Sequence, residues 1–328
     1  MILILSHEEY EQGTDPVIDW LLYHRAPFLK ITLHDLVSGR VNYQIDITNR
    51  DVCINGVSVR QQVQVIWHRR LMGEMQNVLP RFSHPLHREV QHTVRRELTE
   101  LVTYISTLFA DKRWLTTFNK LNVNKLEMLN EAQRCGFTIP DSQIINNRTD
   151  LERFYASSPS GLISKTISNA TTVYAQDDYL YGLFTQALTS DVIAHLPPSF
   201  FPTLFQQKVS ADYEIRVFYL DGALYPTAIL SANPQKSVDR KLDSSHKMTH
   251  MVPCQLPPVV EEAAHRFMHQ IGLNTGCIDL IRDGSGAYYF LEINPVGQYL
   301  AESNQCNYHL EQRIADWLIE NATCYDHA

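Results

Sequence analysis

Two pairs of apolar, strand-like runs, each closed by a turn sequence, constrain this chain more than any other feature. The run at 213–220 is followed by Asp221-Gly222 and a second run beginning at Ala223. The run at 277–282 is joined by Asp283-Gly-Ser-Gly286 to another run at 287–294. An Asp-Gly pair or a short Gly-rich loop between such runs predicts a β-hairpin. The second half of the chain therefore has to contain antiparallel sheet, and we expect helices packed on one side of it.

The first part of the chain has a different pattern. A short apolar run at 2–5 predicts a buried strand, and Asp15-Pro16 predicts the start of a helix. Asn55-Gly56, flanked by apolar residues, predicts a hairpin, and residues 86–109 carry apolar side chains at helical spacing. Residues 1–118 are thus predicted to form a mixed α/β domain.

The remainder, 119–328, is predicted to be an α+β domain with a central part, 119–205, and a C-terminal part, 206–328. A helix is expected from Asn124 to Arg134 and a short strand at 161–165. Pro197, Pro198 and Pro202 predict a loop before the two hairpins. A length of 328 residues agrees with about two domains.

Composition excludes several classes of function. The chain has 28 Lys and Arg against 36 Asp and Glu, a formal net charge of −8, which argues against a protein whose main partner is nucleic acid. Its six cysteines form no CxxC pair, which favours reduced thiols in a cytosolic protein. The apolar N-terminal run is too short for a signal peptide, and no stretch is long enough to span a membrane. The sequence therefore predicts a cytoplasmic protein without a membrane or nucleic-acid partner.

The second hairpin carries Asp279, Glu292 and Asn294 on one predicted face. Pairing of Arg282 with Ala287 would place Asp279 opposite Phe290 and make Glu292 its diagonal neighbour. Two carboxylates and an amide oxygen on a rigid hairpin form an oxygen-rich site that suits Mg²⁺. The alternative is that these are ordinary solvent-facing strand residues.

Several cationic side chains are further candidates. Glu214 and Arg216 share a face of an otherwise apolar strand, so they form a structural ion pair, cover a solvent-facing surface or face a ligand. Lys125 and Lys165 are placed to reach a phosphate as point charges, although an isolated lysine is usually a solvated surface residue. Arg240 lies in a polar stretch that is either a surface loop or a lid carrying an arginine to developing phosphate charge.

Histidine pairs four residues apart, such as His265 and His269, have metal-like spacing but no evident third ligand, so a zinc site is not favoured. No Ser-His-Asp arrangement with an elbow motif is present, so a hydrolase is not favoured either.

The order of these features resembles that of the ATP-grasp ligases from about Lys125 to the end of the chain. The most specific segment is Phe290-Leu-Glu-Ile-Asn-Pro-Val-Gly-Gln298. Within that superfamily the chain is similar to the peptide macrocyclases that make graspetides (microviridin-type ligases), and most of all to the peptide maturases of grasp-with-spasm systems. Ile2-Leu-Ile-Leu-Ser6 and Val65-Ile-Trp-His-Arg-Arg70 resemble the N-terminal domain of that group. The resemblance implies an ATP-grasp fold, two α+β subdomains that grip ATP, preceded by the mixed α/β domain.

The resemblance also implies a reaction and a set of site residues. ATP would activate an Asp or Glu side chain of a ribosomally made precursor peptide as an acyl phosphate, and a Ser, Thr or Lys side chain would attack it to close a ring. The implied nucleotide contacts are Lys125, Lys165, Gln207, Lys208, Val209 and Glu214, the implied Mg²⁺ ligands are Asp279, Glu292 and Asn294, and the implied catalytic residues are Arg216 and Arg240.

Two alternatives remain open at this point. One is a ligase that adds a free amino acid to a peptide or small molecule, and the other is a nucleotide-binding module without catalysis. The expected cofactors are ATP and Mg²⁺, and the expected partner is the leader and core of a precursor peptide. A homodimer is one option for the assembly.

Overall fold

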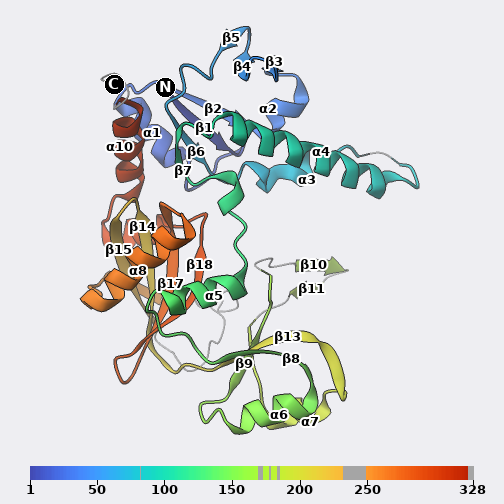
Figure 1. Ribbon diagram of the computed structural model, residues 1–328, viewed down its shortest axis with the longest axis vertical. Helices are drawn as coiled ribbons and strands as arrows, with labels where there is room; N and C mark the ends of the chain where they lie inside the picture. Colours follow the sequence, from blue (N-terminus) through green and yellow to red (C-terminus); the bar gives the residue numbers. More distant parts are fainter. Residues whose placement is uncertain (82, 169–172, 177–178, 183–184, 232–248, 324–328) are drawn as a thin grey trace. The chain divides into compact units, whose positions relative to one another are not determined.

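A computed structural model describes residues 1–328 except 82, 169–172, 177–178, 183–184, 232–248 and 324–328 (Figure 1). Its contacts divide the chain into two compact units. Unit 1 comprises Met1–Asn122 and Pro295–Ala328, and unit 2 comprises Val123–Asn294. No helix in the described ranges is both long enough and apolar enough to cross a membrane.

Unit 1 is built on a parallel sheet of four strands in the order β2-β1-β6-β7. All five residues of β1 are buried, as expected for a central strand of a parallel sheet covered on both faces. The strands are β1 (Ile2–Ser6), β2 (Phe28–Thr32), β6 (Val65–His68) and β7 (Arg113–Leu115). The predicted mixed α/β character of the N-terminal part is therefore confirmed.

The helices of unit 1 begin and end close to where the sequence predicts. The helix expected at Asp15-Pro16 is α1 (Asp15–Tyr23), and the long amphipathic helix is α4 (His87–Leu108). The remaining helical elements of the N-terminal segment are α2 (Leu33–Ser38), η1 (Leu71–Glu74), α3 (Met75–Val78) and η2 (Phe118–Lys120).

The Asn55-Gly56 hairpin is also confirmed. It joins β4 (Asp51–Ile54) to β5 (Val57–Ser58), and β3 (Tyr43–Asp46) completes a small antiparallel sheet. Asn55 and Gly56 both have positive φ, 50° and 78°, which the two central residues of a type I′ turn require.

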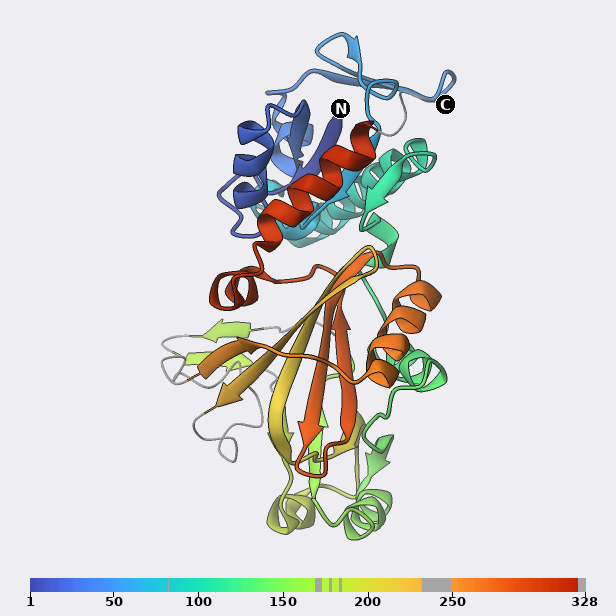
Figure 2. The ribbon, with the colours of Figure 1, turned by 90° about the vertical axis from the view of Figure 1, so that its left-hand side faces the viewer.

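The C-terminal segment differs from the predicted domain plan, which assigned 119–328 to one domain. Its helices, α9 (Leu300–Cys306) and α10 (Leu310–Thr323), belong to unit 1. Figure 2 shows α10 beside α1, and α10 also contacts β1 and β6. The reason is hydrophobic burial, because Leu310, Ile314 and Leu318 on α10 are at most 2% exposed.

His68, the last residue of β6, is 1% exposed and pairs in register with Leu5. Burial lowers the pKa of His68 to about 4 from its usual 6.5, because charging the ring would require desolvating a cation. The folded protein therefore holds His68 neutral at neutral pH.

This burial predicts acid sensitivity of the fold. In the unfolded chain His68 becomes protonated as the pH falls below 6.5, whereas in the folded chain it stays neutral until the pH reaches about 4. The stabilisation is thus complete above pH 6.5, and about 3 kcal/mol is lost as the pH falls to 4. In urea unfolding, the free energy of unfolding of His68→Gln should depend on pH less over this interval than that of the wild-type protein. His24→Gln, at the exposed end of α1, should keep the pH dependence of the wild-type protein. An equal change of the free energy of unfolding with pH in the wild-type protein and in His68→Gln would contradict the prediction.

The larger sheet of unit 2 has five antiparallel strands in the order β16-β15-β14-β17-β18. Both hairpins predicted from the sequence lie in it, joining β14 to β15 and β17 to β18. The strands are β14 (Ala211–Leu220), β15 (Ala223–Ser231), β16 (Thr249–Pro253), β17 (Thr275–Asp283) and β18 (Tyr288–Asn294).

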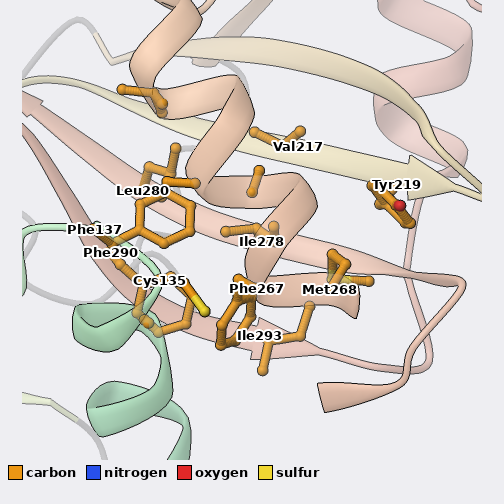
Figure 3. Packing of buried hydrophobic residues seen from close by; sticks show 14 of the residues in the cluster. Cys135, Phe137, Val217, Tyr219, Phe267, Met268, Ile278, Leu280, Phe290 and Ile293 are labelled. Atoms are coloured by element: carbon orange, nitrogen blue, oxygen red, sulfur yellow. The ribbon is translucent and has the colours of Figure 1, made fainter. Parts of the chain in front are cut away.

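One face of this sheet is covered by α5 (Lys125–Arg134) and α8 (Pro258–Ile271), as predicted. Figure 3 shows Phe267 of α8 close to Ile293 of β18 within this cluster, and Phe267 and Phe290 meet edge to face with ring centroids 5.0 Å apart. Alternate residues in the middle of β14 and β17 belong to the cluster: Ile215, Val217, Tyr219, Ile278 and Leu280. The residues between them therefore occupy the opposite face, on which the candidate site lies.

A second sheet of unit 2 has the order β12-β9-β13-β8. Its strands are β8 (Ser142–Asn147), β9 (Leu162–Lys165), β12 (Gln186–Ala187) and β13 (Ser199–Gln207), and the same part of the chain contains α6 (Arg148–Ala156) and α7 (Ser190–His195). A separate two-stranded sheet pairs β10 (Val173–Gln176) antiparallel with β11 (Tyr179–Gly182). The expectation of a loop through Pro202 was wrong, because β13 already begins at Ser199. The pairing with β8 is irregular between Ser199 and Thr203, and such an irregularity accommodates a proline, which has no N–H for the ladder.

Candidate functional site

A row of charged residues crosses three adjacent strands of the five-stranded sheet. Arg216 of β14 is paired in register with Asp279 of β17, and Asp279 is paired with Glu292 of β18. Residues paired directly across an antiparallel ladder lie on the same face. Asn294 follows two residues later on β18, opposite Cys277. The three predicted metal ligands and Arg216 thus share the face that α5 and α8 leave uncovered.

The predicted register of the β17–β18 hairpin was wrong: Arg282 pairs with Tyr288 and not with Ala287, a difference of one position, and at Asp279 the difference is two positions. Asp279 faces Glu292 directly and does not face Phe290. A β-bulge between Asp279 and Leu280 accounts for the second position, because it adds one residue to β18 at Leu291, which would otherwise face Asp279. Phe290 consequently turns into the hydrophobic cluster, where it is fully buried, while Glu292 remains on the other face. The bulge therefore brings the two carboxylates closer together than the predicted diagonal arrangement would.

Arg216 and Asp279 form a bidentate ion pair. The guanidinium donates from Nε to Oδ1 over 2.8 Å and from Nη2 to Oδ2 over 3.0 Å. Both side chains are mostly buried, 18% and 19% exposed. A planar fork of this kind fixes the orientation of both groups as well as their separation. Arg216 is thus held rigidly on the candidate site.

Lys125 contacts Glu292 of β18 and Thr166, the residue that follows β9. Its Nζ lies 3.4 Å from Glu292 Oε2 and 3.4 Å from the carbonyl oxygen of Thr166, and its side chain is only 10% exposed. Lys125 is the first residue of α5, which Asn124 caps by accepting hydrogen bonds from the N–H groups of Leu126 and Glu127. The helix start therefore fixes the root of the lysine beside Glu292.

Thr166 is a partner that sequence reasoning missed. Its contact with Lys125 uses a main-chain oxygen, so no residue type at position 166 could have signalled it. Thr166 directly follows Lys165, the last residue of β9, which pairs with Leu204 of β13. Lys125 therefore bonds the main chain of the residue that directly follows Lys165.

The segment predicted to line an adenine pocket, Gln207 to Val209, begins at the last residue of β13. The backbone N–H of Gln207 donates to Asp141 over 2.8 Å, and that of Lys208 donates to Gly161 over 2.9 Å. Because these donors are occupied, an adenine edge would have to be recognised by the carbonyl groups of this segment or by the N–H of Val209. Glu214 lies on β14 two residues before Arg216, opposite Ile281.

Arg240, the second predicted catalytic residue, lies outside the described residues. Of the other ten candidates, side-chain contacts and ladder pairs bring five together: Lys125, Arg216, Asp279, Glu292 and Asn294. For Lys165, Gln207, Lys208, Val209 and Glu214 the structure gives the element and its neighbours. The roles of all ten residues remain predictions.

The chemistry of this face suits Mg²⁺. Among the described residues no three His, Cys, Asp or Glu side chains come together as a metal-ion site. A cation would therefore rest on two carboxylates, Asp279 and Glu292, and the amide oxygen of Asn294. Mg²⁺ typically binds one or two carboxylates and completes its shell with phosphate oxygens and water. Lys125 and Arg216, which contact the same carboxylates, would add positive charge for a triphosphate.

Solved structures share this fold over the whole chain. The macrocyclase MdnC of Microcystis aeruginosa MRC, solved with its precursor peptide MdnA, is 20% identical, with a TM-score of 0.79 over 97% of this chain and 99% of that one. A RiPP-associated ATP-grasp ligase of Chryseobacterium gregarium, solved with ADP and a leader and core peptide, is 19% identical, with a TM-score of 0.76 over 97% and 96%. The ATP-grasp ligase PsnB, solved with a precursor variant, Mg and ADP, is 15% identical, with a TM-score of 0.74 over 98% of each chain.

No family model matches the chain, and no curated protein matches it in sequence. At identities this low the solved structures establish the fold alone. 

Substitution of the carboxylate closest to Lys125 tests the metal site. Glu292→Gln should weaken binding of Mn²⁺, measured by electron paramagnetic resonance with ADP present, by about tenfold or more, because a carboxylate ligand is lost. Its melting temperature should stay near that of the wild-type protein, since Glu292 is 37% exposed. Glu262→Gln, on the exposed surface of α8, is the matched control. Unchanged Mn²⁺ affinity in Glu292→Gln would remove Glu292 from the metal site.

The full-length likeness, together with the two-sheet arrangement of unit 2 and the parallel-sheet unit 1, confirms the predicted fold class: this chain has the α+β fold of the ATP-grasp ligases, with a mixed α/β N-terminal part.

Proposed function

We propose that this protein is an ADP-forming ATP-grasp ligase that closes rings in a ribosomally made precursor peptide. It would activate an Asp or Glu side chain of the peptide and join it to a Ser, Thr or Lys side chain as an ester or amide. The observation that carries the proposal is the row Arg216, Asp279 and Glu292 with Lys125 at its end, because it combines oxygen ligands for a cation with two fixed positive charges.

The comparisons support a peptide substrate. MdnC, the Chryseobacterium ligase and PsnB were each solved with a precursor peptide, and each aligns with this chain from end to end, including unit 1. The proposed partner is accordingly a precursor with a leader and a core. We place the protein in the cytoplasm, with no nucleic-acid or membrane partner, and a homodimer is one option for its assembly.

In the proposed binding mode, Lys125 and Lys165 hold the nucleotide phosphates, Gln207, Lys208 and Val209 line the adenine, and Glu214 binds the ribose. Asp279, Glu292 and Asn294 hold Mg²⁺, which when bound neutralises phosphate charge and orients the γ-phosphoryl group. Phosphoryl transfer demands positioning and charge stabilisation more than covalent assistance, and this set of residues supplies both.

The reaction then has two steps. A peptide carboxylate oxygen attacks the γ-phosphorus, the bond to the β-phosphate oxygen breaks, and ADP and an acyl phosphate form. A hydroxyl or amine of the same peptide next attacks the acyl carbon, loses its proton, and expels inorganic phosphate. Arg216, held in place by Asp279, is suited to stabilise negative charge in the transferring groups, and Arg240 would do the same.

The mass of the product tests the reaction. Ring closure must make the peptide lighter by one water for each bond formed, whereas ligation of a free amino acid must make the acceptor heavier. Mass spectrometry of a precursor peptide encoded beside this protein, incubated with ATP and Mg²⁺, should show the loss of water and release of ADP. D-cycloserine synthetase DcsG also aligns, with a TM-score of 0.55, so a small-molecule ligase is the relevant alternative. A heavier product, or no change in the peptide, would overturn ring closure.

Arg240 provides a second test, because charge on the transferring groups develops only during the reaction. We expect Arg240→Ala to bind ADP, measured by calorimetry, with an affinity close to that of the wild-type protein while forming almost no cyclic product. A large loss of ADP affinity would instead make Arg240 a contact to the bound nucleotide.

A further inference from the structure

The carboxyl edge of the parallel sheet in unit 1 carries a cluster of charges that the proposed ATP site does not use. The sheet order β2-β1-β6-β7 places β1 between strands that follow it on either side. After β1 the chain forms β2 on one side of β1, and it later forms β6 on the other side of β1. The segments that follow β1 and β6 therefore run in opposite directions away from the carboxyl edge of the sheet. In open α/β sheets, ligands are generally bound at such a switch point.

Three charged residues meet at this edge: Glu11, after β1, and Arg69 and Arg70, after β6. Glu11 is 5% exposed, and its Oε2 accepts hydrogen bonds from Arg69 Nε, the Gly13 N–H and the Thr14 hydroxyl at 2.8–2.9 Å. Burial alone would raise the pKa of Glu11, but the charges and hydrogen bonds around it, chiefly from Arg69, keep that pKa below its usual value. One carboxylate therefore lies between two guanidinium groups, and the cluster has a net charge of +1.

Arg69 is already committed to the fold of unit 1. Its Nη1 donates to the carbonyl oxygens of Val296 and Gly297 at 2.7 and 3.1 Å, and its guanidinium lies over the ring of Tyr299 at 5.3 Å. Its side chain is 5% exposed. Gly13 is required here, because a Cβ at that position would lie 2.0 Å from Arg69 Nη2. Arg69 thus has almost no accessible surface with which to contact a ligand.

The surplus positive charge is therefore presented by Arg70. Its side chain is 31% exposed, and its Nη1 lies 3.4 Å from Glu11 Oε1, longer than a charge-assisted hydrogen bond. Burial, and to a lesser degree repulsion from Arg69, lower the pKa of Arg70, so a second anion beside it would be favourable.

The backbone at Arg70 provides an independent observation. Arg70 has φ 57° and ψ 23°, in the left-handed region that side chains other than Gly, Asn and Asp rarely adopt. Such strain costs free energy and tends to occur at ligand-binding sites, where it places a side chain in an otherwise inaccessible position. Asparagine or glycine would adopt this backbone conformation at a lower free-energy cost, so the conformation of the turn does not explain an arginine at position 70.

We propose that Arg70 binds a carboxylate side chain of an acidic peptide at the carboxyl edge of the unit 1 sheet. The proposal rests on the proposed function, because it names a recognition site for the peptide substrate. A single surplus positive charge balances one carboxylate, whereas a phosphate dianion would leave negative charge unbalanced. The neighbouring ion pair of Glu8 with Arg40 is neutral and does not alter this balance.

The test uses a fluorescein-labelled heptapeptide with two Glu residues and its twin with Gln at both positions, without nucleotide. Fluorescence anisotropy should show that the wild-type protein binds the Glu peptide about tenfold or more tightly than the Gln peptide. Arg70→Asn, which tolerates the left-handed backbone, should abolish this preference, and Arg70→Lys should retain part of it.

Arg60→Gln is the matched control. Arg60 is also half-buried and also pairs with one acid, Asp111, but it bonds residues that precede β7 and therefore lies toward the opposite edge of the sheet. It should keep the preference for the Glu peptide. Equal binding of the two peptides by the wild-type protein, or a preference that survives in Arg70→Asn, would overturn the proposal. Displacement of the peptide by inorganic phosphate at lower concentration than by glutarate would also overturn it.

The two proposals fail in different measurements. If the proposed function is wrong, the nucleotide-dependent change in peptide mass is absent while the charge preference of peptide binding remains. If the Arg70 site is wrong, Arg70→Asn keeps the preference for the Glu peptide, whatever the mass of the product.

Discussion

The ladder between β14 and β17 is the interaction on which the candidate site depends. It runs from Ala211 opposite Asp283 to Leu220 opposite Thr275, and it sets which side chains face each other across the middle of the sheet. Because side chains alternate along a strand, a shift of one residue would send Arg216 or Asp279 into the hydrophobic cluster. Burial of Ile215 and Val217 on one face therefore fixes the charged pair on the other.

The same sheet shows how a local irregularity can serve chemistry. The bulge in β18 lets Phe290 and Ile293 both enter the cluster, although they are three residues apart. Regular alternation would put one of them on the site face. The bulge thus allows an aromatic residue to fill the core and Glu292 to face Asp279 in the same strand. Lys125 and Arg216 then counter the two acids, so that partly buried carboxylates are each held beside a cation.

Unit 1 also contains buried charges that are held by pairing, but there the cations outnumber the carboxylate. Glu11 and Arg69 are both almost fully buried, and a buried charge is tolerated only when it is paired and hydrogen-bonded. The pair ties the segment after β1 to the end of β6 and, through the carbonyl oxygens of Val296 and Gly297, to the returning C-terminal segment. Because Glu11 and Arg69 neutralise each other, Arg70 carries the positive charge that remains unbalanced in this cluster.

The sequence alone determined the local elements and the identity of the chemical groups. The hairpins at Asn55-Gly56 and Asp221-Gly222, the start of α5 after Asn124 and the extent of α4 follow from turn chemistry, capping and periodicity, which act over a few residues. The candidate oxygen ligands on the last hairpin could be named from the sequence for the same reason, and their role remains a prediction. Only the tertiary structure decided that Asp279 faces Glu292 directly, that Lys125 bonds the carbonyl of Thr166, and that the C-terminal helices belong to unit 1. Each of these depends on packing between distant segments or on a main-chain atom, and neither leaves a signal in the residue types along the chain.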